Sequence, residues 1–142
     1  MTATQRYRAQ HAELTALILQ ITVLLQDSNI SKKATEIRNL ISSLAGKLSI
    51  HLAIETKNLY PKLMAHSDPD IRALSKRYSD EMTAMSNDFT RFNQRWLTAA
   101  LIEKDPANFI ADTTRVMNAI QSRIDREKQG LYKLVDDLDG KD

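Results

Sequence analysis

The chain contains no cysteine, and it has only three glycines and three prolines among its 142 residues. The absence of cysteine excludes disulfide bonds, thiolate metal sites and cysteine nucleophiles. The scarcity of glycine and proline disfavours a β-rich fold, because such folds need many tight turns. Only a helical fold remains well supported by the composition.

Long apolar runs and one-sided charge are missing as well. No stretch is long enough to span a bilayer, and the start, Met1-Thr-Ala-Thr-Gln-Arg6, has no apolar signal region. The formal net charge of +2 comes from mixed signs without a basic block. Nucleic-acid binding therefore has no electrostatic support. We expect a soluble, cytoplasmic protein that contacts neither membrane nor nucleic acid.

The apolar residues that are present recur with helical spacing, and the length suits one domain, residues 1–142. Four helices are predicted, at about residues 5–26, 32–66, 69–98 and 106–138. The pairs Asp68-Pro69 and Asp105-Pro106 each place a capping aspartate before a proline at the first helical position. Pro61 should kink the second helix. Because the connections are short, the prediction is an all-α, antiparallel up-down-up-down four-helix bundle.

Two polar residues interrupt the apolar seam of the second helix. That seam consists of Ile37, Ile41, Leu44 and Leu48. His51 and Glu55 follow on the same face, one turn apart, where further leucines would be expected. Burying an imidazole beside a carboxylate is costly unless a metal ion or a counter-charge pairs with them.

The two halves of the chain resemble each other. Arg6, Tyr7, His11 and Leu14 correspond to Arg77, Tyr78, Met82 and Met85, at an offset of 71 residues. His51, Leu52, Glu55, Leu59 and Tyr60 correspond to Arg123, Ile124, Glu127, Leu131 and Tyr132, at an offset of 72. Two matches at nearly the same offset indicate a repeat of two helical hairpins.

The pattern His51-x-x-x-Glu55-x-x-x-Leu59-Tyr60-Pro61, with a lone histidine at His11, resembles the hemerythrin-like, or HHE cation-binding, bundles. The resemblance covers nearly the whole chain. It implies metal ligands at His11, His51 and Glu55, and a fourth-helix carboxylate at Glu127. In that family two irons share bridging carboxylates and take terminal histidines from all four helices. Such sites bind oxygen, sense oxygen or redox state, or handle iron.

The chain departs from this pattern at two ligand positions. The family's third-helix histidine falls at Met82, and its fourth-helix histidine falls at Arg123. Methionine is a poor ligand for hard iron, and arginine is no ligand at all and adds a permanent positive charge. Thr56 and Lys128 also replace carboxylates that often follow the ligand glutamates. We therefore do not expect an intact di-iron centre.

The preferred hypothesis is that Arg123 replaces the charge of the metal by lying between Glu55 and Glu127 and forming forked hydrogen bonds. Such a degenerate bundle would be a non-enzymatic regulatory, signalling or protein-interaction module whose partner and oligomeric state the sequence does not name. The alternative keeps a metal ion. His11, His51 and one or both glutamates would bind a single iron or zinc for sensing or iron handling.

Other chemistry has less support. A phosphotransfer bundle needs an exposed histidine with a glycine-rich neighbourhood, whereas His51 should point inward. No nucleophile–base pair or phosphate-binding glycine loop suggests a hydrolase or a transferase.

Overall fold

The computed structural model describes residues 2–139 and is helical throughout, with no strand in that range. In chain order the elements are α1 (Gln5–Leu25), the 3₁₀ turn η1 (Ile30–Lys33), α2 (Ala34–Ile54), the π-helical segment η2 (Glu55–Leu59), α3 (Tyr60–Met64), α4 (Pro69–Arg95), α5 (Ala99–Lys104), α6 (Pro106–Arg126), the π-helical segment η3 (Glu127–Leu131) and α7 (Tyr132–Asp139). The prediction of an all-helical fold is confirmed.

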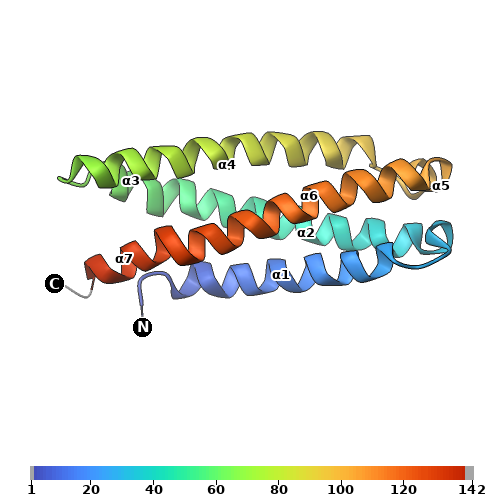
Figure 1. Ribbon diagram of the computed structural model, residues 1–142, viewed down its shortest axis with the longest axis horizontal. Coiled ribbons are helices and arrows are strands. Elements are labelled where there is room, and N and C mark those ends of the chain that lie inside the picture. The colour runs from blue at the N-terminus through green and yellow to red at the C-terminus, as the bar shows by residue number, and fades with distance from the viewer. Residues whose placement is uncertain (1, 140–142) are drawn as a thin grey trace.

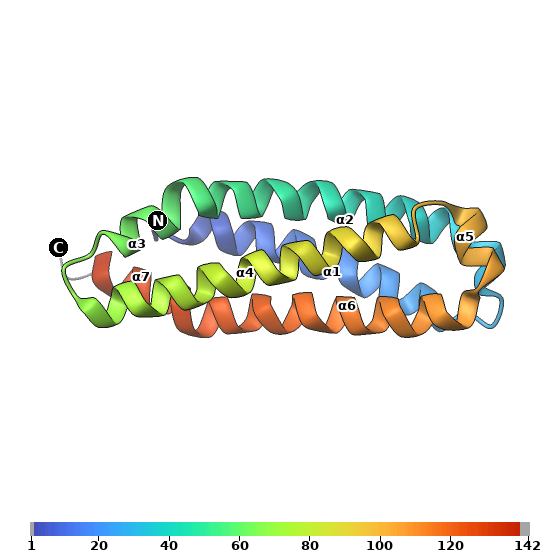
Figure 2. The same ribbon diagram turned by 90° about the horizontal axis from the view of Figure 1, so that it is seen from above.

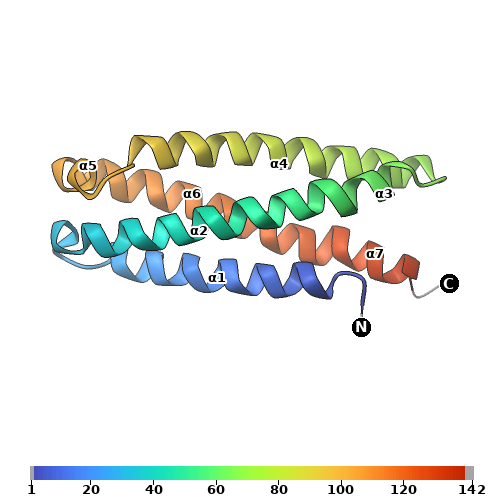
Figure 3. The same cartoon turned by 180° about the vertical axis from the view of Figure 1, so that it is seen from behind.

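The long helices α1, α2, α4 and α6 run along the length of the molecule and form a bundle (Figure 1). Seen from above, α4 lies between α2 and α6 (Figure 2). The short helix α5 lies at one end, whereas α3 and α7 lie at the other end, with the chain's N-terminus on the same side (Figure 3). Each long helix therefore passes the middle of the molecule once.

The helix boundaries agree with the prediction except around residue 98. The capping residues act as expected, since Asp68 accepts a hydrogen bond from Asp70 N and Asp105 accepts one from Asn108 N. The third long helix ends at Arg95 instead of residue 98. Thr98 caps the additional helix α5, which the sequence analysis did not predict.

Two π-helical segments interrupt otherwise continuous helices, and each begins at a glutamate. In η2 the N–H of Tyr60 bonds to the carbonyl oxygen of Glu55, and in η3 the N–H of Tyr132 bonds to that of Glu127. The sequence predicts a kink in the second helix at Pro61. Because η3 has no proline, proline alone does not explain these segments.

The core consists of two apolar clusters with a polar layer between them. The larger cluster packs α1, α2, α4, α5 and α6, and the smaller one packs the opposite end around Leu59, Leu131 and Tyr132. The buried polar layer comprises His11, His51, Glu55, Arg123 and Glu127. Among the described residues no helix is long and apolar enough to cross a membrane.

Candidate metal centre

The polar layer gathers residues from three long helices at one level of the bundle. His11 comes from α1, His51 from the last turn of α2 and Glu55 from η2, while Arg123 comes from α6 and Glu127 from η3. All five are buried, with exposed fractions of 5% or less. The structure thus brings together the two halves of the repeat at the positions predicted from the sequence.

The two histidines face each other through their Nε2 atoms, which lie 3.1 Å apart. His51 Nδ1 lies 2.7 Å from the side-chain oxygen of Gln10. Because an amide oxygen only accepts, Nδ1 carries the proton and Nε2 presents its lone pair to the cluster. Burial lowers the pKa of His51 to about 4, so the ring stays neutral at pH 7. A metal-binding histidine is commonly oriented by this kind of hydrogen bond.

Glu55 Oε1 directs a lone pair toward the lone pair of His51 Nε2. Its Oε1 lies 2.8 Å from His51 Nε2, and its Oε2 accepts a hydrogen bond from the Tyr132 hydroxyl at 2.9 Å. Burial raises the pKa of Glu55 to about 9, and the charge of Glu127 adds to the shift. Two facing lone pairs repel unless a proton or a metal ion lies between them. In the metal-free protein, the Glu55 proton fills that place.

Glu127 is held in the opposite state. Burial alone would raise its pKa, but the hydrogen bond with His11 and the charge of Arg123 outweigh it and lower the pKa to about 2. Its Oε1 lies 3.5 Å from His11 Nε2 and 3.6 Å from Arg123 Nε. Glu127 therefore carries the negative charge of the carboxylate pair.

Two tyrosines that the sequence analysis did not assign to the site also enter it. The Tyr132 hydroxyl lies 3.0 Å from His11 Nε2 and 3.4 Å from His51 Nε2. The Tyr60 hydroxyl donates to Glu127 Oε2 at 3.3 Å and accepts from Arg123 Nη2 at 2.8 Å. Desolvation raises the pKa of both phenols. The available signal was the repeated Leu-Tyr pair that follows each glutamate.

The π-helical segments explain how these tyrosines reach the site. In a regular α-helix, a residue five positions after a glutamate points about 140° away from it around the axis. The i→i+5 hydrogen bond of a π segment accommodates an extra residue in the turn. Tyr60 and Tyr132, five residues after Glu55 and Glu127, are thereby returned to the inner face.

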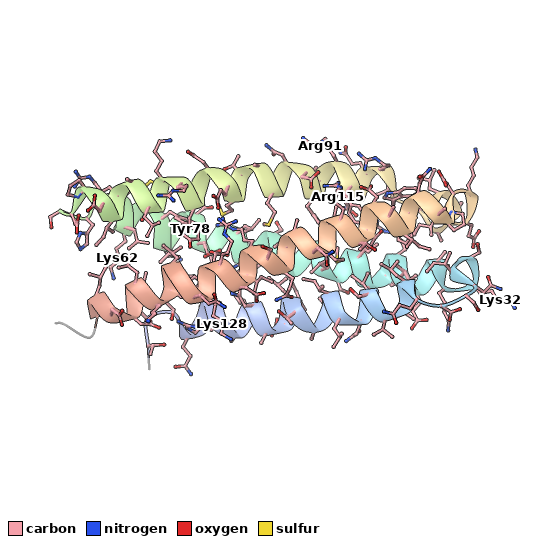
Figure 4. All side chains as sticks on the ribbon, viewed as in Figure 1. Lys32, Lys62, Tyr78, Arg91, Arg115 and Lys128 are labelled. Atoms are coloured by element: carbon pink, nitrogen blue, oxygen red, sulfur yellow. The ribbon has the colours of Figure 1, made fainter. Side chains whose placement is uncertain are left out.

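The contacts of Arg123 differ from the predicted fork between the two glutamates. Its ion-pair partners among the described residues are Glu127 and Glu81, and the Nη1–Oε2 distance to Glu81 is 3.7 Å. Its guanidinium also lies over the ring of Tyr78, which Figure 4 labels beside α4. The fork is absent because Tyr132 and His51 already occupy the oxygens of Glu55.

Met82, at the other lost ligand position, is buried on α4. Its sulfur accepts a weak hydrogen bond from Thr56 at 3.9 Å. Thr56, which was noted only as a replacement for a carboxylate, thus contacts Met82. This side of the layer offers a thioether and a guanidinium, neither of which suits hard iron.

The donor set could hold a metal ion. The ligand atoms of His11, His51 and Glu127 all lie within 4.8 Å of one another. Ligands bound at about 2.1 Å lie about 3.0–3.4 Å apart at right or tetrahedral angles, close to the separations observed around His11 and His51. His11 Nδ1 has no hydrogen-bond partner among the described residues. A second ion would have to lie against the positive charge of Arg123.

A cavity of about 370 Å³ reaches the layer between α1 and α6. His11 lines its wall, and Arg8, Asp125 and Lys128 line the remainder together with neutral side chains. Lys128 is visible beside α1 in Figure 4. A second cavity, of about 390 Å³, is lined by Thr56 and Met82, so cavities approach both the histidine side and the Met82 side of the layer.

Comparisons with known proteins identify the family. Neither the curated proteins nor the solved structures gave a match. A family model described as the hemerythrin HHE cation-binding domain matches residues 2–135, nearly the whole chain. The chain belongs to the hemerythrin HHE cation-binding family.

Proposed function

We propose that this protein is a hemerythrin-like domain that binds a single transition-metal ion, iron in the first instance, for oxygen or redox sensing or for iron handling. His11, His51 and Glu127 are its proposed ligands, with Glu55 as a fourth once it loses its proton. The observation that carries the proposal is the buried cluster of His11, His51 and Glu127, whose ligand atoms all lie within 4.8 Å of one another. The scaffold proposed for it is an up-down-up-down bundle of two repeated hairpins.

The charges support this choice of site. Two imidazoles with one or two carboxylates form the donor set that suits non-haem iron or zinc. Gln10 orients His51, and the tyrosine hydroxyls hold the glutamates, so the donors are positioned before a metal arrives. Bound iron would supply reversible one-electron redox chemistry. The protein's residues would hold it and keep bulk water away.

The test is metal uptake by protein prepared without a chelator. Elemental analysis and titration with Co²⁺ should give one metal per chain. His51→Ala should weaken metal affinity by at least about tenfold. Loss of a residue that only hydrogen-bonds to a ligand already costs about 10–100-fold, and this change removes a ligand itself. His66→Ala is the matched control, since His66 lies in the α3–α4 connection and accepts a hydrogen bond from Asp68 N.

Two results would count against this proposal. Absence of metal from the wild type after exposure to iron, cobalt and zinc would remove its basis. Two irons per chain would instead show that the second subsite is intact despite Met82 and Arg123.

The burial of Arg123 supports a second candidate function. Its exposed fraction is 5%, and it pairs with Glu127 without any metal. A bundle stabilised in this way would be a metal-free, non-enzymatic module that acts by contact with a protein partner. The same measurements separate the two candidates. The metal-free module predicts no bound metal and a melting temperature that neither added metal nor chelator changes.

A further inference from the structure

Tyr132 occupies the centre of the histidine side of the polar layer. It begins α7 immediately after η3, and its side chain is fully buried. The i→i+5 hydrogen bond from its N–H to the carbonyl of Glu127 turns the phenol inward. Tyr132 therefore comes from the same half of the repeat as Glu127 but lies against the residues of the other half.

The phenol oxygen contacts three of the four proposed ligand residues. It lies 2.9 Å from Glu55 Oε2, 3.0 Å from His11 Nε2 and 3.4 Å from His51 Nε2. These separations match those between neighbouring atoms that share one metal ion, about 3.0–3.4 Å for bonds of about 2.1 Å. By comparison, Glu127 Oε1 lies 3.5 Å from His11 Nε2. By distance alone, the phenol oxygen fits a shared ion at least as well as Glu127 does.

Tyr60 provides an internal contrast, because it is the repeat-related tyrosine. Its hydroxyl bonds to Arg123 Nη2 and Glu127 Oε2, and no hydrogen bond joins it to a histidine among the described residues. Tyr60 thus lies on the arginine side of the layer, where a cation is already present. The two tyrosines have equivalent sequence positions but different neighbours.

We propose that Tyr132 is itself a metal ligand, which binds ferric iron through its phenolate oxygen beside His11, His51 and Glu127. This inference rests on the proposed metal-binding function and specifies the chemistry of that site. As the oxygen–iron bond forms, the phenol O–H bond breaks and its proton passes to solvent. A phenolate and a carboxylate offset two of the three ferric charges, so the site would prefer the ferric to the ferrous state.

The experiment uses the full chain loaded with ferric citrate. A phenolate bound to ferric iron gives an intense visible charge-transfer absorption, and excitation into it enhances phenolate ring vibrations in the Raman spectrum. The wild type should show both signals. Tyr132→Phe should lose them while still binding one iron per chain, with affinity reduced by about tenfold or more. Tyr78→Phe is the matched control and should keep both signals, because its hydroxyl donates to the carbonyl oxygen of Arg126, outside the donor set. Tyr60→Phe, which loses a contact with the ligand Glu127, shows which of the two tyrosines in the layer carries the band.

Each alternative outcome has a definite meaning. One bound ferric ion without the visible band overturns the role of Tyr132 but leaves the metal-binding function standing. Loss of the band in Tyr60→Phe, with retention in Tyr132→Phe, overturns the assignment in favour of the other tyrosine. No bound iron in the wild type overturns both proposals.

A measurement that does not depend on the variant's folding completes the test. Wild-type protein made with ring-deuterated tyrosine should show the enhanced Raman bands shifted to lower frequency. Unshifted bands would exclude a tyrosine ligand even if Tyr132→Phe did not fold. The Zn²⁺-loaded protein, which has no such charge transfer, provides the blank.

Discussion

The two halves of the bundle use the same helical framework but surround equivalent glutamates with different chemistry. Glu55 in the first half meets the neutral His51, and burial raises its pKa to about 9. Glu127 in the second half meets Arg123 and His11, and its pKa falls to about 2. One carboxyl of the pair is thus protonated and the other charged. The comparison teaches that equivalent glutamates in a repeated framework take opposite charge states when one lies on the histidine side of the layer and the other lies beside Arg123.

The largest expected effect comes from restoring the symmetry. Met82→His together with Arg123→His replaces the thioether and removes the internal cation, so a second metal ion should bind. Metal content should rise from one to two per chain, and thermal stability should increase more strongly with added metal than in the wild type. Each single substitution should remain at one metal. A double variant that still binds only one would show that the arginine side has closed around its own packing.

Removing the guanidinium of Arg123 without replacing it should destabilise the protein, because Glu127 then loses its cationic partner. Arg123→Leu leaves Glu127 buried and charged, and breaking a buried pair from one side costs about 3–5 kcal/mol. Urea unfolding at pH 7 with chelator present should show this loss in the free energy of unfolding. The control Arg115→Leu removes pairs with Asp88 and Asp112 at a half-exposed position and should cost no more than about 1 kcal/mol.

The pH dependence of Arg123→Leu follows from the sign of the Glu127 shift. In the wild type the pKa of Glu127 is lowered on folding. Its contribution to the free energy of unfolding is therefore fully present above about pH 4.5 and is lost as the pH falls toward 2. Without the guanidinium, this pKa rises by desolvation and the carboxylate takes up a proton sooner. The deficit of the variant relative to the wild type should therefore shrink between neutral pH and about pH 5. A deficit independent of pH would argue that Arg123 acts by packing alone.

For Glu55 we expect the opposite dependence of stability on pH in the metal-free protein. Its pKa is raised from 4.5 to about 9 on folding, so its contribution is complete below about pH 4.5 and is lost as the pH rises through 9. His51, whose pKa is lowered from 6.5 to about 4, opposes this trend only below about pH 6.5. Between pH 9 and 6.5 the free energy of unfolding should rise on acidification, by at most about 1.4 kcal/mol per pH unit.

Glu55→Gln tests that assignment. The amide cannot ionise, so the slope between pH 9 and 6.5 should disappear and the variant should be at least as stable as the wild type at pH 8. Glu13→Gln is the control, because Glu13 forms an exposed ion pair with Lys47 and its replacement should leave the slope intact. A slope that persists in Glu55→Gln would assign it to another group.

Much of the molecule could be predicted from local patterns. Helical periodicity and the Asp-Pro caps predicted the long helices, because each signal depends on neighbouring residues only. The seam positions predicted that His51 and Glu55 would point inward, and the family resemblance implied that His11 and Glu127 would join them in one site. The family resemblance that rested on these residues is confirmed by the match over residues 2–135.

The π segments and their consequences could not be predicted in this way. An extra residue within a helical turn leaves the apolar spacing around it nearly unchanged, so the inward rotation of Tyr60 and Tyr132 carries no periodic signal. This rotation also determines the partners of Arg123. The Tyr132 hydroxyl donates a hydrogen bond to Glu55 Oε2, the oxygen that a guanidinium lying between Glu55 and Glu127 would have needed. Seam arguments assign residues to the core, but which of two acceptors a guanidinium contacts depends on all the side chains around it.

The smallest predicted effect concerns the tyrosines that precede the ligand positions. Tyr7 stacks on Tyr132 on the histidine side of the layer, with ring centroids 5.7 Å apart, whereas Tyr78 donates a hydrogen bond to the carbonyl oxygen of Arg126. A Cβ on Gly130 would lie 2.5 Å from the Tyr78 hydroxyl oxygen and 3.7 Å from the carbon that bears it. The absence of a side chain at Gly130 therefore leaves space for the Tyr78 hydroxyl. The equivalent position in the first half is Asn58.

Gly130→Ala should consequently lower the free energy of unfolding by about 1 kcal/mol, because overpacking of about 1–3 kcal/mol exceeds a helix-propensity gain of about 1 kcal/mol. Gly46→Ala, where nothing lies within 4 Å of the added Cβ, should instead raise it by about 0.5–1 kcal/mol. Tyr78→Phe removes the clashing oxygen, so Gly130→Ala in that background should become neutral or stabilising. A double-mutant cycle measured by urea unfolding gives the coupling directly. If Gly130→Ala costs the same in both backgrounds, the hydroxyl is not what requires glycine in the second half.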